Sequence, residues 1–243
     1  FARGKWMPNS TTFTYQWQSR DQKVLQLRRW NVADASQTTL LTERSETWVN
    51  LHKDLRFLAG RDQFVWASER DGFKHLYLYN TDGELLRQLT TGDWVVDEVV
   101  AVDNTSGQVY FTGRKDTVLE SHLYRVPLAG GEITRVTQRE GSHSISFADD
   151  ASIYIDTFST INHPPQVSLH KASGEQLTWL EENALDATHP LTPFMKDWIE
   201  PEFGSFTSED GVELYYRLYK PKQLKDKQKQ KRNMQRLELE MHV

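Results

Sequence analysis

Hydrophobic and polar residues alternate along most of the first 180 residues, which is the pattern of strands that bury one face. The alternation recurs in four similar segments about 45 residues apart, each reading as a strand, a tight turn and a second strand. These segments are residues 24–42, 75–90, 122–137 and 166–180. No long stretch follows the 3.6-residue period of an amphipathic helix. The pattern therefore predicts an all-β region with internal repeats and excludes a helical solenoid.

Glycine marks the turn in three of the four segments. A short hairpin turn needs a positive φ, which glycine adopts without steric strain. The three turns are Asp82–Gly83, Gly130–Gly131 and Ser173–Gly174. The first segment has the longer turn Asp34–Ala35–Ser36 in the same place. We expect three tight hairpins and one looser turn.

Two further strands are expected upstream of each hairpin. They are residues 48–57 and 63–68 in the second repeat, 95–102 and 108–113 in the third, and 143–147 and 152–158 in the fourth. Residues 1–8 would supply the inner strand of the first repeat. Four short antiparallel strands per repeat form one blade of a β-propeller. The predicted fold is a partial β-propeller at 1–182, with four blades at about 1–45, 46–92, 93–141 and 142–182.

The repeats end near residue 180. Residues 183–200 are interrupted by Pro190 and Pro193, which predicts a crossover linker with at most a short helix. Residues 201–224 contain two strand-like runs, 201–208 and 212–219, around a Glu-Asp-Gly turn. Residues 225–243 are basic and rich in Lys and Gln. We expect a solvated or disordered tail there, with a functional basic arm as the alternative.

Composition and charge exclude several classes of binding partner and of site chemistry. The chain has 29 Lys and Arg against 34 Asp and Glu, a net charge of −5, and this acidic balance argues against nucleic-acid binding. No segment approaches the roughly 18 apolar residues of a membrane span, so we expect no membrane partner. The absence of Cys excludes a disulfide scaffold, a thiol nucleophile and a Cys-ligated metal.

The sequence also lacks the short motifs of several enzyme classes. It contains no Gly-x-Ser-x-Gly, no Gly-x-Gly-x-x-Gly or Walker loop, and no His-Glu-x-x-His. We therefore predict no catalytic residues, no cofactor and no metal. His75 and His122 occupy matching positions at strand starts in two blades. A repeated packing or hydrogen-bonding role explains them better than metal ligation.

Several distinctive strings occur in order along the blades. They are ETWVNLH at 46–52, FVWASERDGFKHLYLY at 64–79, LTTGDWVV at 89–96 and ENALDATHP at 182–190. These strings are very similar to blades of bacterial members of the dipeptidyl peptidase IV family of serine peptidases. The resemblance covers about residues 1 to 224, and a generic propeller would share the period and the turns but not the strings.

The resemblance implies an eight-bladed propeller that caps an α/β-hydrolase domain. Such enzymes remove N-terminal X-Pro or X-Ala dipeptides from peptides with a free N-terminus, using a Ser-His-Asp triad. This chain would be a fragment: the second half of the propeller, followed at 201–224 by the first strands of the hydrolase domain. The triad and the glutamate pair that holds the substrate amino group are missing, so the chain alone should be inactive. The change of sequence after about residue 224 suggests an aberrant end such as a frameshift.

The resemblance also implies partners, location and candidate site residues. The parent enzyme would be a homodimer in the bacterial periplasm or outside the cell. In vertebrate members an Arg-Phe-Arg run after a Trp-Val-Gly string reaches the extended substrate site. The positions that align here are Leu51 and His52, which differ in type from that run, and Trp48 precedes them. We take these three as candidate substrate contacts. Packing of Trp48 between blades is the alternative.

Two other functions remain open. The chain could be a stand-alone propeller module that binds peptides or proteins. It could also belong to a serine peptidase of the acylaminoacyl or oligopeptidase type. Four blades of an eight-bladed ring would expose a sheet face at both ends, so we expect the isolated chain to associate or aggregate.

Overall fold

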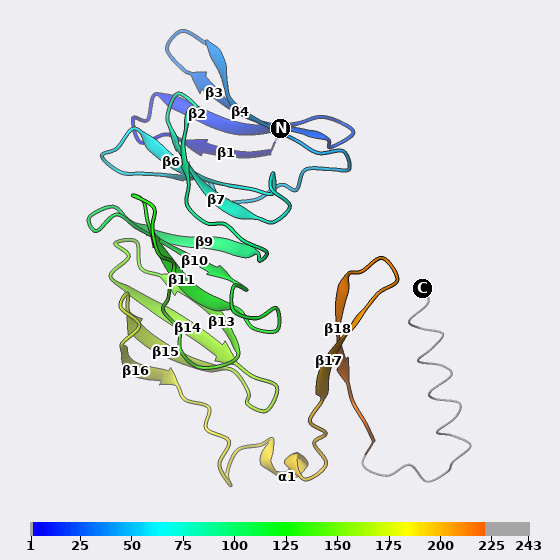
Figure 1. Ribbon diagram of the computed structural model, residues 1–243. Coiled ribbons are helices and arrows are strands. Elements are labelled where there is room, and N and C mark those ends of the chain that lie inside the picture. The colour runs from blue at the N-terminus through cyan, green and yellow to red at the C-terminus, as the bar shows by residue number, and fades with distance from the viewer. Residues whose placement is uncertain (1, 222–243) are drawn as a thin grey trace. The chain divides into compact units, whose positions relative to one another are not determined.

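The computed structural model describes residues 2–221, and its first sixteen strands form four successive four-stranded sheets (Figure 1). The first contains β1 (Ala2–Trp6), β2 (Thr12–Gln18), β3 (Val24–Asn31) and β4 (Gln37–Arg44). The second contains β5 (Arg56–Phe57), β6 (Gln63–Ser68), β7 (His75–Asn80) and β8 (Leu85–Gln88). The third contains β9 (Val96–Asp103), β10 (Gln108–Gly113), β11 (His122–Pro127) and β12 (Thr134–Arg135). The fourth contains β13 (Ser142–Phe147), β14 (Ile153–Ser159), β15 (Gln166–Lys171) and β16 (Gln176–Glu181).

Each sheet is an antiparallel meander in which neighbours in sequence are neighbours in space. The predicted repeat of four-stranded antiparallel sheets is therefore confirmed. The alternation in sequence sets the two faces of each sheet. In β14, for example, Tyr154, Asp156 and Phe158 are buried, while Ile155 and Thr157 between them are exposed.

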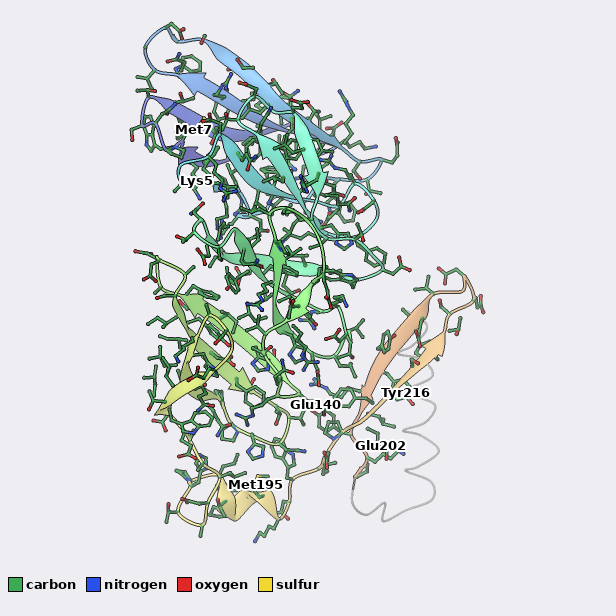
Figure 2. All side chains as sticks on the ribbon, turned by 60° about the vertical axis from the view of Figure 1, so that its left-hand side comes forward. Lys5, Met7, Glu140, Met195, Glu202 and Tyr216 are labelled. Atoms are coloured by element: carbon green, nitrogen blue, oxygen red, sulfur yellow. The ribbon has the colours of Figure 1, made fainter. Side chains whose placement is uncertain are left out.

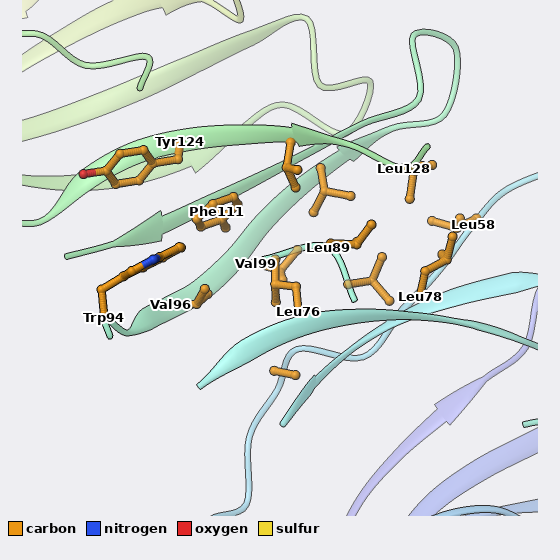
Figure 3. Packing of buried hydrophobic residues seen from close by; sticks show 14 residues of the cluster. Leu58, Leu76, Leu78, Leu89, Trp94, Val96, Val99, Phe111, Tyr124 and Leu128 are labelled. Carbon is orange, nitrogen blue, oxygen red and sulfur yellow. The ribbon is translucent and has the colours of Figure 1, made fainter. Parts of the chain in front are cut away.

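Hydrophobic cores fill the spaces between neighbouring sheets. One cluster joins the first and second sheets, a second joins the second and third, and a third joins the third and fourth. In the middle cluster, Leu76 and Leu78 of β7 pack beside Val96 and Val99 of β9 (Figure 3). Each sheet therefore depends on its neighbour for burial, as expected when one repeat cannot bury both of its faces.

In two of the blades, a histidine at the start of the third strand bonds to a threonine that follows the fourth strand of the same blade. His75 Nδ1 lies 3.0 Å from Thr90 Oγ1, and His122 Nδ1 lies 3.1 Å from Thr137 Oγ1. Both histidines are almost completely buried, and in both blades the threonine hydroxyl also accepts the next backbone N–H. The predicted hydrogen-bonding role of the repeated histidines is confirmed.

The three predicted hairpin turns are also confirmed. Gly83, Gly130 and Gly174 have φ values of +92°, +79° and +99°. Each turn lies against the preceding sheet. A Cβ on Gly83 would lie 2.0 Å from the backbone oxygen of Leu40, and a Cβ on Gly174 would lie 2.8 Å from that of Val136. Glycine is required there by close packing as well as by φ.

One predicted strand is wrong. Of residues 48–57, only β5 at Arg56–Phe57 is a strand. The preceding backbone turns toward the first sheet, where Gln18 Nε2 donates to the oxygen of Val49 (2.7 Å) and Gln16 Nε2 donates to that of His52 (3.1 Å). These bonds tie the carbonyls of Val49 and His52 to the first sheet, and only Arg56 and Phe57 pair with β6.

The chain divides after residue 183, and residues 184–221 form a separate unit as far as they are described. This unit contains the short helix α1 (Thr192–Met195) and a hairpin of β17 (Glu202–Thr207) and β18 (Glu213–Leu218). The hairpin carries Glu202 and Tyr216 on its two strands (Figure 2). The helix and the two strands confirm the elements expected here. The predicted tail at 225–243 lies outside the described residues.

Within the unit of residues 2–183, the first and fourth sheets each have one face that no other sheet of that unit covers. Trp6 and Trp30 are exposed on the first sheet, and Ile155 and Leu180 on the fourth. Because exposed apolar sheet faces drive association, we expect the isolated chain to form oligomers or aggregates. Light scattering coupled to size-exclusion chromatography measures this directly. Monomeric material with a sharp cooperative melt would contradict the expectation.

Candidate functional site: a cavity between the first two sheets

A cavity of about 610 Å³ lies where the first and second sheets meet. Its walls come from the end of β4, the irregular segment 45–52 and the turn at 68–74 between β6 and β7. This size falls within the range of about 300 to 1,000 Å³ that is usual for sites of small ligands. Both charged and apolar side chains line it, so the cavity is the candidate binding site.

The three residues predicted from the sequence all line this cavity. The Trp48 side chain is 57% exposed, so its alternative role in packing between blades is wrong. Leu51 packs against the core that joins the first two sheets, and the His52 side chain is only 12% exposed. Trp48 therefore offers the larger accessible surface. A substrate contact by any of the three stays a prediction.

His52 is held as a neutral imidazole. Its Nδ1 accepts the backbone N–H of Asp54 at 3.2 Å, and its ring packs edge-on against Trp66 with centroids 4.3 Å apart. Burial lowers the pKa of His52 to about 4, and this outweighs the nearby Asp54 carboxylate, which acts in the opposite direction. At neutral pH this side chain presents no charge to the cavity.

This pKa predicts a pH dependence of stability. An unfolded histidine titrates near 6.5, so between about pH 6.5 and pH 4 the unfolded chain binds a proton that the folded chain does not. The free energy of unfolding should therefore fall as pH falls through this window, by at most about 3 kcal/mol from His52. Above pH 6.5 His52 is neutral in both states and contributes no pH dependence.

Urea unfolding at several pH values measures this contribution. H52Q should show a shallower loss of stability between pH 6.5 and 4 than the unaltered chain. H163Q, which changes an exposed histidine, serves as the control and should keep the original slope. Equal slopes in the H52Q variant and the unaltered chain would show that His52 does not titrate as described.

A buried ion pair fixes the segment beside His52. Asp54 is 2% exposed, and its Oδ2 lies 2.7 Å from Lys74 Nζ. Its Oδ1 accepts the backbone N–H of Val99 at 2.9 Å, and Lys74 also donates to the backbone oxygen of Asp97 at 2.6 Å. The pair therefore links the cavity segment, the β6–β7 turn and the third sheet.

A second charged pair lies in the cavity wall, and the sequence analysis missed it. Arg70 Nη2 lies 2.5 Å from Glu43 Oε1 and donates to the Tyr79 hydroxyl at 2.6 Å. Trp66 Nε1 donates to the same Glu43 oxygen at 3.1 Å. Glu43 lies at the end of β4 and Arg70 just after β6. The predicted topology could have revealed this pair. The second and fourth strands of a meander run in the same direction, so the ends of β4 and β6 lie at the same end of neighbouring sheets.

A similar arginine lies at the opposite end of these two sheets. A second cavity of about 490 Å³ there is lined by the β1–β2, β3–β4 and β5–β6 turns. Arg29 in its wall donates to the backbone oxygen of Thr81 at 3.0 Å and contacts the exposed Asp82 at 3.2 Å. Arg29 therefore lies in the same pair of sheets as Arg70 but does not line the first cavity, so a change at Arg29 can serve as a control for a change at Arg70.

The described residues offer no assembled catalytic group. Ser168 Oγ lies 2.8 Å from His170 Nε2, but the other ring nitrogen of His170 faces the backbone oxygen of Gly174 and not a carboxylate. Ser168 is also only 3% exposed, so a substrate cannot reach it. Within residues 2–221, no group of three His, Asp or Glu is placed to hold a metal ion. No helix in the same range is long and apolar enough to cross a bilayer.

The sheets and their connections define a β-propeller region, and comparison with known proteins identifies its family. Residues 1–165 match the family described as the dipeptidyl peptidase IV (DPP IV) N-terminal region. The chain belongs to this family, as the sequence strings predicted.

Individual relatives agree with this assignment. The chain is 30% identical over 220 residues to human dipeptidyl peptidase 8, and the match covers 75% of this chain and 24% of the human protein. It is 30% identical over 198 residues to a probable dipeptidyl-aminopeptidase B of Emericella nidulans, covering 74% of this chain and 20% of that protein. The chain thus spans about a quarter of the length of these relatives or less.

Solved structures share the fold. The crystal structure of Porphyromonas gingivalis dipeptidyl peptidase 4 superposes with a TM-score of 0.79 at 24% identity, covering 90% of this chain and 31% of that one. A putative dipeptidyl aminopeptidase IV from Bacteroides ovatus superposes with a TM-score of 0.76 at 24% identity, covering 91% of this chain and 34% of that one. The expected propeller-like fold is confirmed.

Proposed function

We propose that this chain is the substrate-gating propeller part of a serine peptidase that removes N-terminal X-Pro or X-Ala dipeptides. The observation that carries the proposal is the family match over residues 1–165, because its relatives are named as dipeptidyl peptidases. A propeller beside an active site would exclude folded chains and orient extended peptides. Residues 201–224 would begin the hydrolase domain that supplies the triad.

The cavity supports a role in peptide binding. It places Trp48, Leu51 and His52 in one wall, with an exposed indole and a neutral imidazole. The substrate would be a peptide with a free N-terminus. The parent enzyme would act as a homodimer in the periplasm or outside the cell.

Hydrolysis of an Ala-Pro chromogenic substrate tests the proposed activity. The chain alone should release no product, because it has no assembled nucleophile among its described residues. A longer product of the same gene that includes a Ser-His-Asp domain should be active. Activity in the chain alone would reveal an unrecognised active site. Inactivity of both would favour a stand-alone peptide-binding propeller.

Substrate preference separates the proposal from the remaining alternative. A peptidase of the acylaminoacyl or oligopeptidase type would cleave substrates whose N-terminus is blocked. The proposed enzyme should cleave Ala-Pro substrates and leave their N-acetylated forms intact. Equal cleavage of both forms would assign the propeller to the other type.

A further inference from the structure

We propose that Lys5 and Arg56, on the first strands of the first two sheets, together bind an oxyanion such as phosphate or a carboxylate. This inference does not depend on the proposed peptidase function. It concerns a different part of the chain, because neither residue lines either of the two cavities described above. The two cations lie close together, and an oxyanion that contacts both would supply the negative charge that their surroundings lack.

Both side chains donate to the same backbone oxygen. Lys5 in β1 (Figure 2) donates from Nζ to the oxygen of Leu55 at 3.0 Å, and Arg56 in β5 donates to it from Nη1 at 3.2 Å. The two nitrogens are therefore no more than about 6 Å apart, a distance at which like charges disfavour each other. Partial burial, and after it the Arg56 guanidinium, lower the pKa of Lys5.

Arg56 is held in place by neutral backbone groups alone. Besides the oxygen of Leu55, its Nη1 donates to the oxygen of Lys53 at 2.6 Å, and its Nη2 donates to that of Val99 at 2.6 Å. Val99 lies in β9, so these bonds join the first strands of the second and third sheets. The guanidinium is thus fixed before any ligand arrives, which reduces the ordering cost of binding.

The carboxylate nearest in sequence is already occupied. Asp54 lies two residues before Arg56, but its Oδ2 pairs with Lys74 and its Oδ1 accepts the Val99 N–H. Within residues 2–221, no carboxylate forms an ion pair with Lys5 or Arg56. The positive charge of the pair is therefore left to solvent ions or to a ligand.

The unused donors define the class of that ligand. Lys5 Nζ gives one of its three hydrogens to a described group, and Arg56 Nε has no acceptor among the described residues. Lys5 is exposed, so an ion can reach it, and the exposed Arg3 and Lys53 add further positive charge along the chain. Ammonium and guanidinium groups only donate. A ligand that offers several acceptors and a negative charge complements them, and an oxyanion has both.

Equilibrium dialysis with radiolabelled inorganic phosphate tests the proposal, because it counts bound anion regardless of the oligomeric state of the protein. The measurement is made at neutral pH and constant ionic strength. We expect saturable binding to the unaltered chain at millimolar phosphate. The result does not bear on peptide hydrolysis, so a failure here would leave the test of the proposed function unaffected.

Three variants locate the site. K5Q removes the ammonium from an exposed position and should weaken phosphate binding about tenfold, as expected for the loss of a charged hydrogen bond. K5R keeps the charge and should retain most of the binding. K171Q makes the same change as K5Q at an exposed lysine of the fourth sheet, and it should bind like the unaltered chain. Near-ultraviolet circular dichroism of the eight Trp verifies folding.

Chemical labelling of the unaltered chain gives a second readout, which needs no variant and which a purely structural Lys5 would not change. A bound anion favours the ammonium form, and only the neutral amine reacts with acetic anhydride. Phosphate should therefore slow the acetylation of Lys5 and leave that of Lys171 unchanged, as measured by peptide mass spectrometry at constant ionic strength. Equal acetylation of Lys5 with and without phosphate would overturn the proposal.

Competing anions identify the ligand class. Displacement of labelled phosphate by acetate would support a site for carboxylates and phosphates alike, and displacement by unlabelled phosphate alone would support a site for phosphate-like anions. Weaker binding by K5Q, with K5R and K171Q nearly unchanged, would support the assignment to Lys5. Displacement by chloride as effective as that by phosphate would overturn the oxyanion site. Equal binding by a folded K5Q variant, or no saturable binding at millimolar phosphate, would overturn it as well.

Discussion

Replacing Asp54 with alanine is expected to lower the free energy of unfolding by about 3 to 5 kcal/mol, because it leaves the buried Lys74 ammonium without its counter-charge. The same change removes the acceptor for the Val99 N–H. Urea denaturation followed by Trp fluorescence measures the loss. The effect should extend to the cavity, since Asp54 also holds the segment that carries His52.

Two comparisons make this prediction specific. D82A removes an ion pair with Arg29 whose aspartate is 81% exposed, and it should cost less than about 1 kcal/mol. D54N/K74M removes both buried charges and should recover much of the stability lost in D54A. A D54A variant no less stable than D82A would show that the buried pair does not anchor the segment.

The repeats were predictable from the sequence because the same strand pattern recurs in each blade and a turn glycine recurs in three of the four. Strand alternation, turn glycines and the matching histidines all recur with the blade, so each repeat supports the others. Asp54 gives no such signal. Its neighbours Leu55 and Phe57 make it look like the polar position of a strand, and the lysine that pairs with it lies in another turn.

The segment at 48–57 shows why a local pattern can fail. Its residues alternate as a strand would, but β-propensity reflects the surface on which a segment packs more than an intrinsic preference. Here Gln16 and Gln18, from the neighbouring sheet, bond to its carbonyls. The strand prediction is wrong because these contacts hold the segment against the first sheet. In the same arrangement Trp48 is exposed at the cavity.

The candidate site was only partly predictable for a related reason. The sequence identified Trp48, Leu51 and His52 because all three lie within one short string that resembles the family. Glu43 and Arg70 are far apart in sequence, and each reads as a solvated charge at a strand end. Glu43 is nevertheless only 7% exposed, because Arg70 and Trp66 supply its hydrogen bonds. The meander topology places both strand ends at the same end of neighbouring sheets, and the packing of the two blades then brings the two side chains into contact.

The turn glycines show how closely the blades are packed. Gly83 in the second sheet lies against Leu40 of the first, Gly130 in the third approaches Arg87 of the second, and Gly174 in the fourth lies against Val136 of the third. The recurring glycine therefore has two roles, a positive φ for its own turn and a close approach to the previous blade. Alanine substitutions at two glycines of similar φ can separate these two roles, if only one of the glycines contacts a neighbouring blade.

G83A is expected to lower the free energy of unfolding by about 3 to 5 kcal/mol. Alanine at φ +92° costs roughly 1 to 2 kcal/mol in backbone strain. Its Cβ would also lie 2.0 Å from the backbone oxygen of Leu40, so either the turn or β4 must shift. Both Leu40 and its neighbour Leu41 belong to the core of the first two sheets, which a shift would loosen.

G72A provides the matched control. Gly72 has a similar φ of +100°, but a Cβ there would meet no atom within 4 Å. This variant should show the backbone strain alone, about 1 to 2 kcal/mol. The difference between the two variants, measured by urea denaturation, then isolates the contact between blades. Equal losses would mean that the turn at Gly83 does not press on β4, and that the glycines recur only because their hairpins need a positive φ.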